Sequence, residues 1–395
     1  MSEKMNVPKL RFKEFSGEWE EKRLGSISFR SAKKNKDNQS NEVFTNSAIN
    51  GIVSQRDYFD KDIANQNNLE GYYIVNKDDF IYNPRISNFA PVGPLNRNHL
   101  ATGVMSPLYT VFKIKDTIVN LDFIERYFHT TKWHRYMNNI ANYGARSDRM
   151  NITNNDFIKM PIPLPSKQEQ EKIASFLTSV DTKIEQLTKK KALLEQYKKG
   201  VMQKIFSQEI RFRDDDGGEF SEWVERKISQ IFEITRGNVL AVPMMSQEKN
   251  DDFQYPVYSS QTKNNGLTGY YNEYLFEDCI TWTTDGANAG DANLRRGKFY
   301  CTNVCGVLKS DKGYANQFIA EILNSVTKKH VSYVGNPKLM NNTMGGIKIT
   351  IPSSIEEQTK IANFLSSLDT KISQIEQQLE STKQFKKALL QQMFV

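Results

Sequence analysis

The chain is poor in cysteine, with Cys279, Cys301 and Cys305 the only three in 395 residues. So few cysteines argue against a disulfide framework. No apolar run approaches the ~20 residues needed to span a bilayer, and the N-terminal residues lack the apolar core of a secretion signal. Apolar residues make up 38% of the chain and charged residues 25%, a balance typical of folded domains. The composition therefore predicts a cytoplasmic chain of two or three globular domains.

Catalytic signatures are also missing from the sequence. It contains no G-x-x-x-x-G-K-S/T phosphate loop, no G-x-G-x-x-G dinucleotide fingerprint and no Pro-Asp dipeptide to begin a nuclease motif. The cysteines are too few for a structural zinc site, which needs four protein ligands. The histidines are scattered and form no evident proton-transfer pair; they are His99, His129, His134 and His330. We therefore predict no catalytic residue and no metal site in this chain.

Basic residues outnumber acidic ones, which gives a formal net charge of +7 and a pI near 9.0. A surplus of this size suits a nucleic-acid partner, but many basic proteins have none. Charge alone therefore leaves the partner open.

One segment of the sequence occurs twice. The stretch "EQEKIASFLTSVDTKI" begins at Glu169 and "EQTKIANFLSSLDTKI" begins at Glu357. The match extends without a gap to Phe206 and Phe394, and 18 of the 38 aligned positions are identical. A second pair precedes it, because "LRF" with "FSGEWEEKRL" near the N-terminus resembles "IRF" with "EFSEWVERKI" from residue 210. The chain is therefore an internal duplication, with residues 1–206 as one copy and 207–395 as the other.

The repeated segments have the period of paired helices. Apolar residues recur at steps of four and three, which is typical of a seam between two helices. A helix of ~40 residues is ~60 Å long, so we expect each seam to pack against the other in an antiparallel pair with a globular region at each end. Lys191 and Lys386 interrupt the seam, either fixing its register or marking contacts with another subunit. The predicted seam residues are Ile173, Leu177, Val180, Ile184, Leu187, Ile361, Leu365, Leu368, Ile372 and Ile375. The simpler alternative is two unrelated core helices.

The regions between the repeats diverge but keep a few landmarks. "DFIYN" from Asp79 parallels "DCITW" from Asp278, and short β-rich runs alternate with turn residues and amphipathic stretches. We expect α+β domains here. Arginine and lysine lie among Gly, Asn and aromatic residues in both regions, a composition suited to contacts with bases and phosphates. The candidate DNA-contacting residues are Arg85, Arg97, Arg146, Arg149, Lys263, Arg236, Arg295, Arg296, Lys298 and Lys338.

This order of parts resembles the specificity subunit of type I DNA restriction-modification systems. The resemblance rests on Pro163–Leu187, its repeat Ile351–Ile375, the Trp-containing stretch Leu10–Trp19, and Val257–Tyr271 with Thr283–Gly290. It implies a non-catalytic chain whose two target recognition domains each read half of a split site in double-stranded DNA. It also implies that the helices set the gap and dock two modification subunits, which bind S-adenosylmethionine and methylate adenine. Two restriction subunits, which use ATP and Mg²⁺, would complete the nuclease.

The resemblance also implies an expected layout. Trp-containing segments at 1–22 and 207–226 precede target recognition domains at 23–165 and 227–352, and spacer helices follow at 166–206 and 353–395. We expect a pseudo-twofold α+β chain with the two recognition domains at opposite ends of the helix pair. Aromatic residues at matched helix positions are the expected docking sites for the modification subunits; they are Phe176, Tyr197, Phe364 and Phe385.

Two alternatives stay open at this stage. The chain could be a two-headed DNA-binding adaptor for another enzyme, which the absence of a neighbouring methyltransferase gene would favour. It could also be a coiled-coil scaffold whose end domains bind protein or glycan. Retention on heparin or DNA, abolished by moderate salt, would argue against the scaffold.

Overall fold

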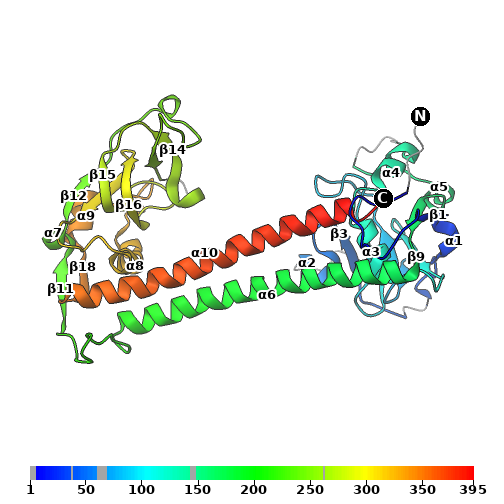
Figure 1. Cartoon of the computed structure of the whole chain (residues 1–395), viewed down its shortest axis with the longest axis horizontal. Helices are drawn as coiled ribbons and strands as arrows, with labels where there is room; N and C mark the ends of the chain where they lie inside the picture. The colour runs from blue at the N-terminus through cyan, green and yellow to red at the C-terminus, as the bar shows by residue number, and fades with distance from the viewer. Residues whose placement is uncertain (1–5, 37–38, 60–68, 143–147, 261–262) are drawn as a thin grey trace. The chain divides into compact units, whose positions relative to one another are not determined.

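The computed structural model describes residues 6–36, 39–59, 69–142, 148–260 and 263–395 (Figure 1). The chain separates into two compact units. Unit 1 comprises Met1–Thr188 and Gln378–Val395, and unit 2 comprises Lys189–Gln377. The two long helices are α6 (Lys167–Phe206) and α10 (Ile355–Gln392). Each of them is divided between the two units, with one end in unit 1 and the other end in unit 2. These helices confirm the prediction made from the repeated segments.

Unit 1 is built on an antiparallel four-stranded sheet with the strand order β2-β9-β6-β7. Three antiparallel strand pairs accompany it: β1-β10, β3-β4 and β5-β8. The strands are β1 (Glu20–Arg23), β2 (Ser28–Arg30), β3 (Phe44–Ser47), β4 (Gly51–Ser54), β5 (Tyr73–Val75), β6 (Phe80–Tyr82), β7 (Leu95–Arg97), β8 (Gly103–Met105), β9 (Thr110–Ile114) and β10 (Pro161–Leu164). The shorter helices are α1 (Leu24–Ile27), α2 (Gln55–Phe59), α3 (Leu121–Phe128), α4 (His134–Ile140) and α5 (Asn154–Ile158).

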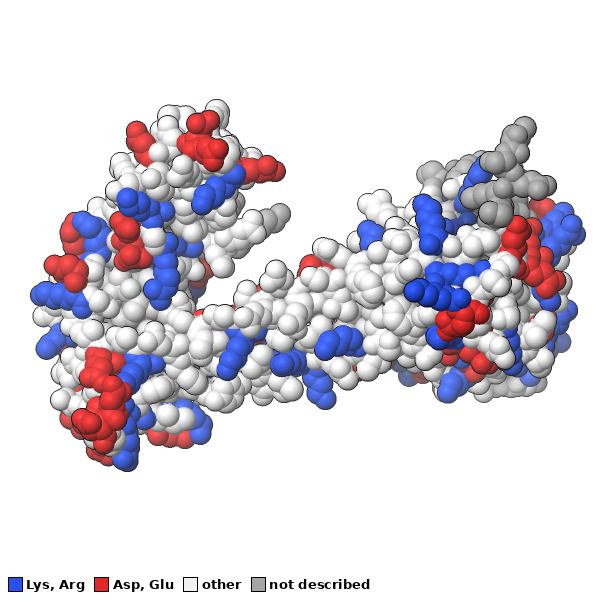
Figure 2. Space-filling view, viewed as in Figure 1, with Lys and Arg blue, Asp and Glu red and all other residues white. Residues whose placement is uncertain are grey.

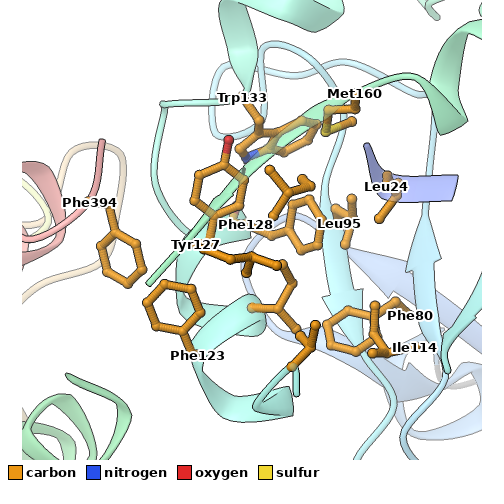
Figure 3. Close-up of a cluster of buried hydrophobic side chains, with 14 of the residues drawn as sticks. Leu24, Phe80, Leu95, Ile114, Phe123, Tyr127, Phe128, Trp133, Met160 and Phe394 are labelled. Atoms are coloured by element: carbon orange, nitrogen blue, oxygen red, sulfur yellow. Dashed lines mark hydrogen bonds between the residues drawn. The ribbon is translucent and has the colours of Figure 1, made fainter. Parts of the chain in front are cut away.

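The main core of unit 1 joins segments from both ends of the chain. Phe394, just beyond α10, lies beside Phe123 and Tyr127 of α3, with ring centroids 5.2 and 6.3 Å away (Figure 3). Its ring also meets Trp19 edge-on, at 6.3 Å. The backbone N–H of Leu10 donates to the carbonyl oxygen of the last residue of α10 at 3.0 Å. The C-terminal helix end therefore packs against the N-terminal Trp-containing segment, as an antiparallel helix pair requires.

Unit 2 contains a six-stranded sheet with the order β12-β17-β15-β16-β13-β14. All neighbouring strands are antiparallel except β13 and β16, and a separate antiparallel pair joins β11 to β18. The strands are β11 (Trp223–Lys227), β12 (Glu233–Arg236), β13 (Tyr255–Tyr258), β14 (Leu267–Tyr271), β15 (Phe276–Thr283), β16 (Ala292–Cys301), β17 (Cys305–Lys309) and β18 (Lys348–Pro352). The helices are α7 (Ile228–Ile231), η3 (Val242–Met244), η4 (Lys263–Gly266), α8 (Gln317–Val326), η5 (Thr327–His330) and α9 (Asn341–Gly346).

The two units share the same arrangement of strands, although the sequences of their variable regions differ. In each, a strand after the Trp-containing segment pairs with the strand before the long helix, as β1 with β10 and as β11 with β18. The four strands β2-β9-β6-β7 match β12-β17-β15-β16 in order and direction. Unit 2 extends this sheet with β13 and β14. The predicted α+β class with an internal repeat is therefore confirmed.

The long helices pack against each other within each unit. In unit 1, residues Ile173 and Leu177 near the start of α6 share a core with Leu389 near the end of α10. In unit 2, Ile205 near the end of α6 shares a core with Ile361 near the start of α10. The helices therefore run antiparallel in both units. Of the ten predicted seam residues, Ile184 and Ile372 are half-buried and the other eight are buried.

The two lysines that interrupt the seam form ion pairs across it. Lys386 Nζ lies 2.5 Å from Asp181 Oδ1 in unit 1, and Lys191 Nζ lies 2.8 Å from Glu376 Oε1 in unit 2. A charge on one helix facing its opposite on the other favours one register over a shifted one. The sequence left two roles open for these lysines, fixing the register or contacting another subunit. The structure shows ion pairs within the chain, which suit the first role.

A buried carboxylate anchors each long helix to its Trp-containing segment. Glu169, in the first turn of α6, accepts hydrogen bonds from Arg11 Nε and Nη2, both at 2.8 Å, and from Trp19 Nε1 at 3.3 Å. Glu357, in the first turn of α10, accepts equivalent bonds from Arg211 at 3.2 and 2.9 Å and from the indole N–H of the matching tryptophan at 3.3 Å. A carboxylate near a helix N-terminus is also favoured by the helix dipole. The duplication thus preserves a three-residue cluster in full.

Candidate nucleic-acid interface

Each unit has a loop that leaves the central sheet and pairs with the segment before its last short helix. In unit 1 the loop follows β6, where the N–H of Ile86 donates to Asp148 O at 3.1 Å and the N–H of Met150 donates to Pro84 O at 2.9 Å. These bonds flank a β-bridge between Arg85 and Arg149 and make them a non-hydrogen-bonded antiparallel pair. In such a pair both side chains emerge on the same face and lie close together. We call this pairing the loop bridge of unit 1.

Unit 2 repeats this loop bridge with different side chains. The N–H of Gly286 donates to Pro337 O at 2.9 Å and the N–H of Leu339 donates to Thr284 O at 2.8 Å. The paired residues are here Asp285 and Lys338. A residue with positive φ lies seven positions before the bridge in both units, at Asp78 and at Asp278. The backbone pattern is therefore the same while the exposed chemistry differs.

A buried aromatic residue lies next to each loop bridge. Tyr82 in unit 1 donates its hydroxyl hydrogen to Val92 O at 2.9 Å, and its ring stacks on Phe157 at 5.2 Å. Trp282 in unit 2 donates its indole N–H to Leu339 O, within the bridge segment itself, at 3.0 Å. Both aromatic residues are almost fully buried. Each loop bridge therefore adjoins the buried core of its unit.

The two loop bridges differ in their electrostatics. In unit 2, Lys338 Nζ lies 3.8 Å from the Asp285 carboxylate, so the cation has an acidic neighbour. In unit 1 the paired residues are two arginines, and like charges on residues directly opposite each other are unfavourable. Among the described residues, the only carboxylate within ion-pair distance of either arginine is Asp148, 3.9 Å from Arg149 Nε. The unit 1 bridge therefore offers two cations to an anionic partner.

A cavity of about 490 Å³ lies beside the unit 1 loop bridge and includes Arg30 and Arg149 in its lining. Two of its lining residues, Arg149 and Asn154, each carry a buried polar atom, Nε and Oδ1, that has no hydrogen-bond partner among the residues that the structure describes. Buried polar atoms normally have partners. Arg30 and Asn154 are not among the contact residues predicted from the sequence, because only the fold brings them to the same cavity as Arg149.

The candidate contact residues fall into different environments. Arg85, Arg149 and Lys338 meet at the loop bridges, whereas Arg236, Arg296 and Lys298 are exposed on β12 and β16. Arg97 is instead held within unit 1 by Asp78 at 2.6 Å and Asp122 at 2.6 Å, with Glu125 at 3.6 Å. Burial opposes its charge, but these carboxylates outweigh burial and raise the pKa of Arg97. Arg146 and the side chain of Lys263 lie outside the part of the chain that the structure describes.

The four candidate docking aromatics form two matched pairs. Phe176 is half-buried and meets Phe12 edge-on at 5.7 Å, and Phe364 meets Phe212 in the same way at 5.8 Å. The second pair stays open, because Tyr197 is 53% exposed and Phe385 is 51% exposed. The Trp-containing segments thus partly cover one aromatic on each helix and leave the other accessible.

Basic side chains are interspersed with acidic ones over the visible face of each unit (Figure 2). Within the described ranges, no cluster of three or more His, Cys, Asp or Glu could hold a metal ion. The helices in that part of the chain are also too polar or too short to cross a membrane.

Comparison with known proteins identifies the class of this fold. A family model described as "Type I restriction modification DNA specificity domain" matches residues 16–196 and 220–383. A Mycoplasma pneumoniae protein named for the N-terminus of a type I specificity subunit is 41% identical over 145 residues, which are 36% of this chain and 75% of that protein. The type I restriction enzyme MpnII specificity subunit from the same organism is 34% identical over 146 residues, or 36% of this chain and 43% of that protein.

A solved structure agrees with these sequence matches. The S subunit of a type I restriction-modification system from M. genitalium superposes with a TM-score of 0.61 at 17% identity, covering 98% of this chain and 99% of that one. This likeness shows a shared fold. Because the family model covers most of the sequence in two separate stretches, the chain belongs to the type I restriction-modification DNA specificity family.

Proposed function

We propose that this chain is the non-catalytic DNA-recognition subunit of a cytoplasmic type I restriction-modification complex, and that each unit reads one half of a split DNA site. The observation that carries the proposal is the pair of loop bridges, which share one backbone pattern but pair Arg85 with Arg149 in unit 1 and Asp285 with Lys338 in unit 2. A constant scaffold with different exposed side chains suits two related modules with different sequence preferences. Phosphate contacts position such a module, and base contacts give it specificity.

The proposal extends to the domain layout and the partners. Residues 23–165 and 227–352 are the target recognition domains, and the antiparallel parts of α6 and α10 dock two modification subunits. S-adenosylmethionine belongs to those subunits, and ATP with Mg²⁺ to restriction subunits that join for cleavage. The open aromatics Tyr197 and Phe385 support two equivalent docking sites, because they occupy matched positions of the duplicated helices and are about equally exposed.

The half-site assignment predicts separable effects. Arg149→Ala is expected to weaken recognition of one half-site only, and Lys338→Ala of the other only. A lost base contact costs about 1–3 kcal/mol and relaxes one base position, whereas a lost phosphate contact weakens binding evenly. Binding of the complex to duplexes with each half-site mutated in turn measures this. Lys159→Ala and Lys348→Ala, which remove exposed cations from the same units, should change neither half-site. Equal losses at both half-sites in either test variant would refute the assignment of one half-site to each unit.

The docking assignment predicts a change in stoichiometry. The wild-type chain should bind two modification subunits, while Tyr197→Ala and Phe385→Ala should each retain one at concentrations that saturate the wild type. An aromatic residue that acts as an interface hot spot costs about 2 kcal/mol or more when it is truncated to alanine. Native mass spectrometry of the co-expressed complexes gives the ratio directly, with Lys199→Ala and Lys387→Ala as controls on the same helices. Two partners on both aromatic variants, or one on the wild type, would contradict the docking scheme.

A further inference from the structure

Unit 2 contains a deeply buried arginine. Arg295, on β16, is 7% exposed. Its Nε donates to Thr281 Oγ1 at 3.0 Å, and its guanidinium lies 3.8 Å above the centre of the Tyr258 ring. Among the described residues, no carboxylate lies within the 4.0 Å of an ion pair. A buried charge is costly unless it is paired, and burial here lowers the pKa of the guanidinium.

Other partly buried arginines of this chain are paired with carboxylates. Arg11, Arg126 and Arg211 each lie within 3 Å of a carboxylate oxygen, and Arg97 is surrounded by three carboxylates. These arginines are less deeply enclosed than Arg295 and yet are all neutralised. Arg295 departs from this pattern, so an anion from outside the chain would complete its environment.

A cavity of about 350 Å³ opens at Arg295. The other lining residues apart from Asp291 are neutral, and most of them carry a hydrogen-bonding side chain: Ser259, Asn265, Gly266, Thr283, Asn288, Ala292, Asn293 and Asn324. The side-chain amide of Asn293 has no hydrogen-bond partner within the described part of the chain. One carboxylate, that of Asp291, also lines the cavity, but Lys328 Nζ neutralises it at 2.6 Å. The lining therefore suits an anion with several acceptor oxygens.

The walls of the cavity are fixed by the backbone. Asp291 O accepts from the N–H of Thr283 at 3.0 Å, and Thr283 O accepts from the N–H of Gly290 at 2.8 Å. Gly290 has φ of +91°, a conformation that favours glycine. On the opposite wall, the N–H of Ser259 donates to Gly266 O at 2.8 Å. The cavity is therefore formed before any ligand enters.

We propose that this cavity binds a phosphate group of the DNA backbone, with Arg295 as its cation and Asn293 as a further donor. The inference rests on the proposed function, because it takes unit 2 to contact DNA. Arg295 is 7% exposed and lines a cavity, so its partner has to enter that cavity. A phosphate projects from the DNA backbone and suits this geometry better than the edge of a stacked base. An arginine fork suits phosphate oxygens. Arg295 would then anchor unit 2 on DNA and leave sequence reading to the exposed residues.

The test compares Arg295→Gln and Arg295→Lys with wild type, each as the full chain in complex with its modification partner. Affinity for the specific duplex and for a random-sequence duplex is measured across a salt series. We expect Arg295→Gln to lower affinity about tenfold on both duplexes and to reduce the slope of log K against log salt by about one. Arg295→Lys keeps the charge and should restore the slope. Lys309→Gln, which removes a cation paired with Glu233 in the same sheet, should leave the slope unchanged.

Three results would overturn the proposal. Relaxed preference at one base position with an unchanged slope would mean that Arg295 reads a base. A lower unfolding midpoint with unchanged affinity of the folded variant would mean a structural role only. If inorganic phosphate raises the Tm of the wild-type chain but not of Arg295→Gln at constant ionic strength, while the DNA slope is unchanged, the site serves a free phosphate compound instead. Binding to the random-sequence duplex tests the phosphate site independently of sequence recognition. If the wild type preferred no split site, the proposed function would be refuted, but the effect of Arg295→Gln on the salt slope would still test the cavity.

Discussion

Replacing Arg211 with methionine is expected to lower the free energy of unfolding by about 3–5 kcal/mol, because breaking a buried ion pair leaves an uncompensated charge. The charge in question is Glu357, which is 0% exposed and receives two hydrogen bonds from Arg211 and one from Trp223. Without the arginine, the carboxylate keeps a single donor from its side-chain cluster. Arg11→Met should have a similar effect through Glu169, which occupies the matching place in unit 1.

Denaturant titration of the full chain measures these losses. Arg213→Met and Lys13→Met are the matched controls, since each removes an exposed cation two residues from the arginine tested. The controls should stay within about 0.5 kcal/mol of the wild type, as surface substitutions usually do. A loss below about 1 kcal/mol for both Arg11→Met and Arg211→Met would show that the duplicated cluster does not anchor the helices.

Lengthening both long helices is expected to change the gap between half-sites without changing the sequences read. A heptad inserted at matched points near Leu187 and Ile375 keeps the seam in register. It adds ~10 Å to each helix, at 1.5 Å per residue, which corresponds to about three base pairs. Three base pairs also rotate the DNA by roughly a third of a turn. We therefore expect weaker binding together with a wider preferred gap.

The control for this prediction is a heptad inserted into α6 alone, which offsets the two seams and should abolish assembly rather than change the gap. The readout is genome-wide adenine methylation in cells that carry the altered gene. An unchanged gap in the doubly lengthened variant, or altered half-site sequences, would refute the proposal that the helices set the spacing.

Much of the framework could be predicted from the sequence because it depends on local, periodic signals. The long helices follow from apolar steps of three and four, and the repeat follows from direct identity between the copies. The role of Lys191 and Lys386 could not be settled in the same way. Their partners, Glu376 and Asp181, are distant in sequence and become visible only when the antiparallel register is known.

The sequences of the two variable regions align poorly with each other, because the regions have the same strand pairing but few identical side chains. Asp79 appeared to match Asp278 in the sequence, but positive φ and the loop bridges align Asp78 with Asp278 instead. A shift by one residue exchanges the two faces of a strand. The surroundings of a side chain are likewise not visible in the sequence. Arg97 and Arg295 were both predicted to contact DNA because each lies in a stretch that contains Arg and Asn. Only the fold shows that acidic residues surround the first and that a polar cavity opens at the second.

The central claim is that one chain reads two half-sites with its two units. Sequencing of methylated adenines in the source genome, with this gene present and with it deleted, tests the claim most directly. We predict one split motif, made of two short specific sequences separated by a fixed unspecified gap, that is methylated only when the gene is present. Methylation that does not change on deletion, or loss of a single uninterrupted motif, would contradict it.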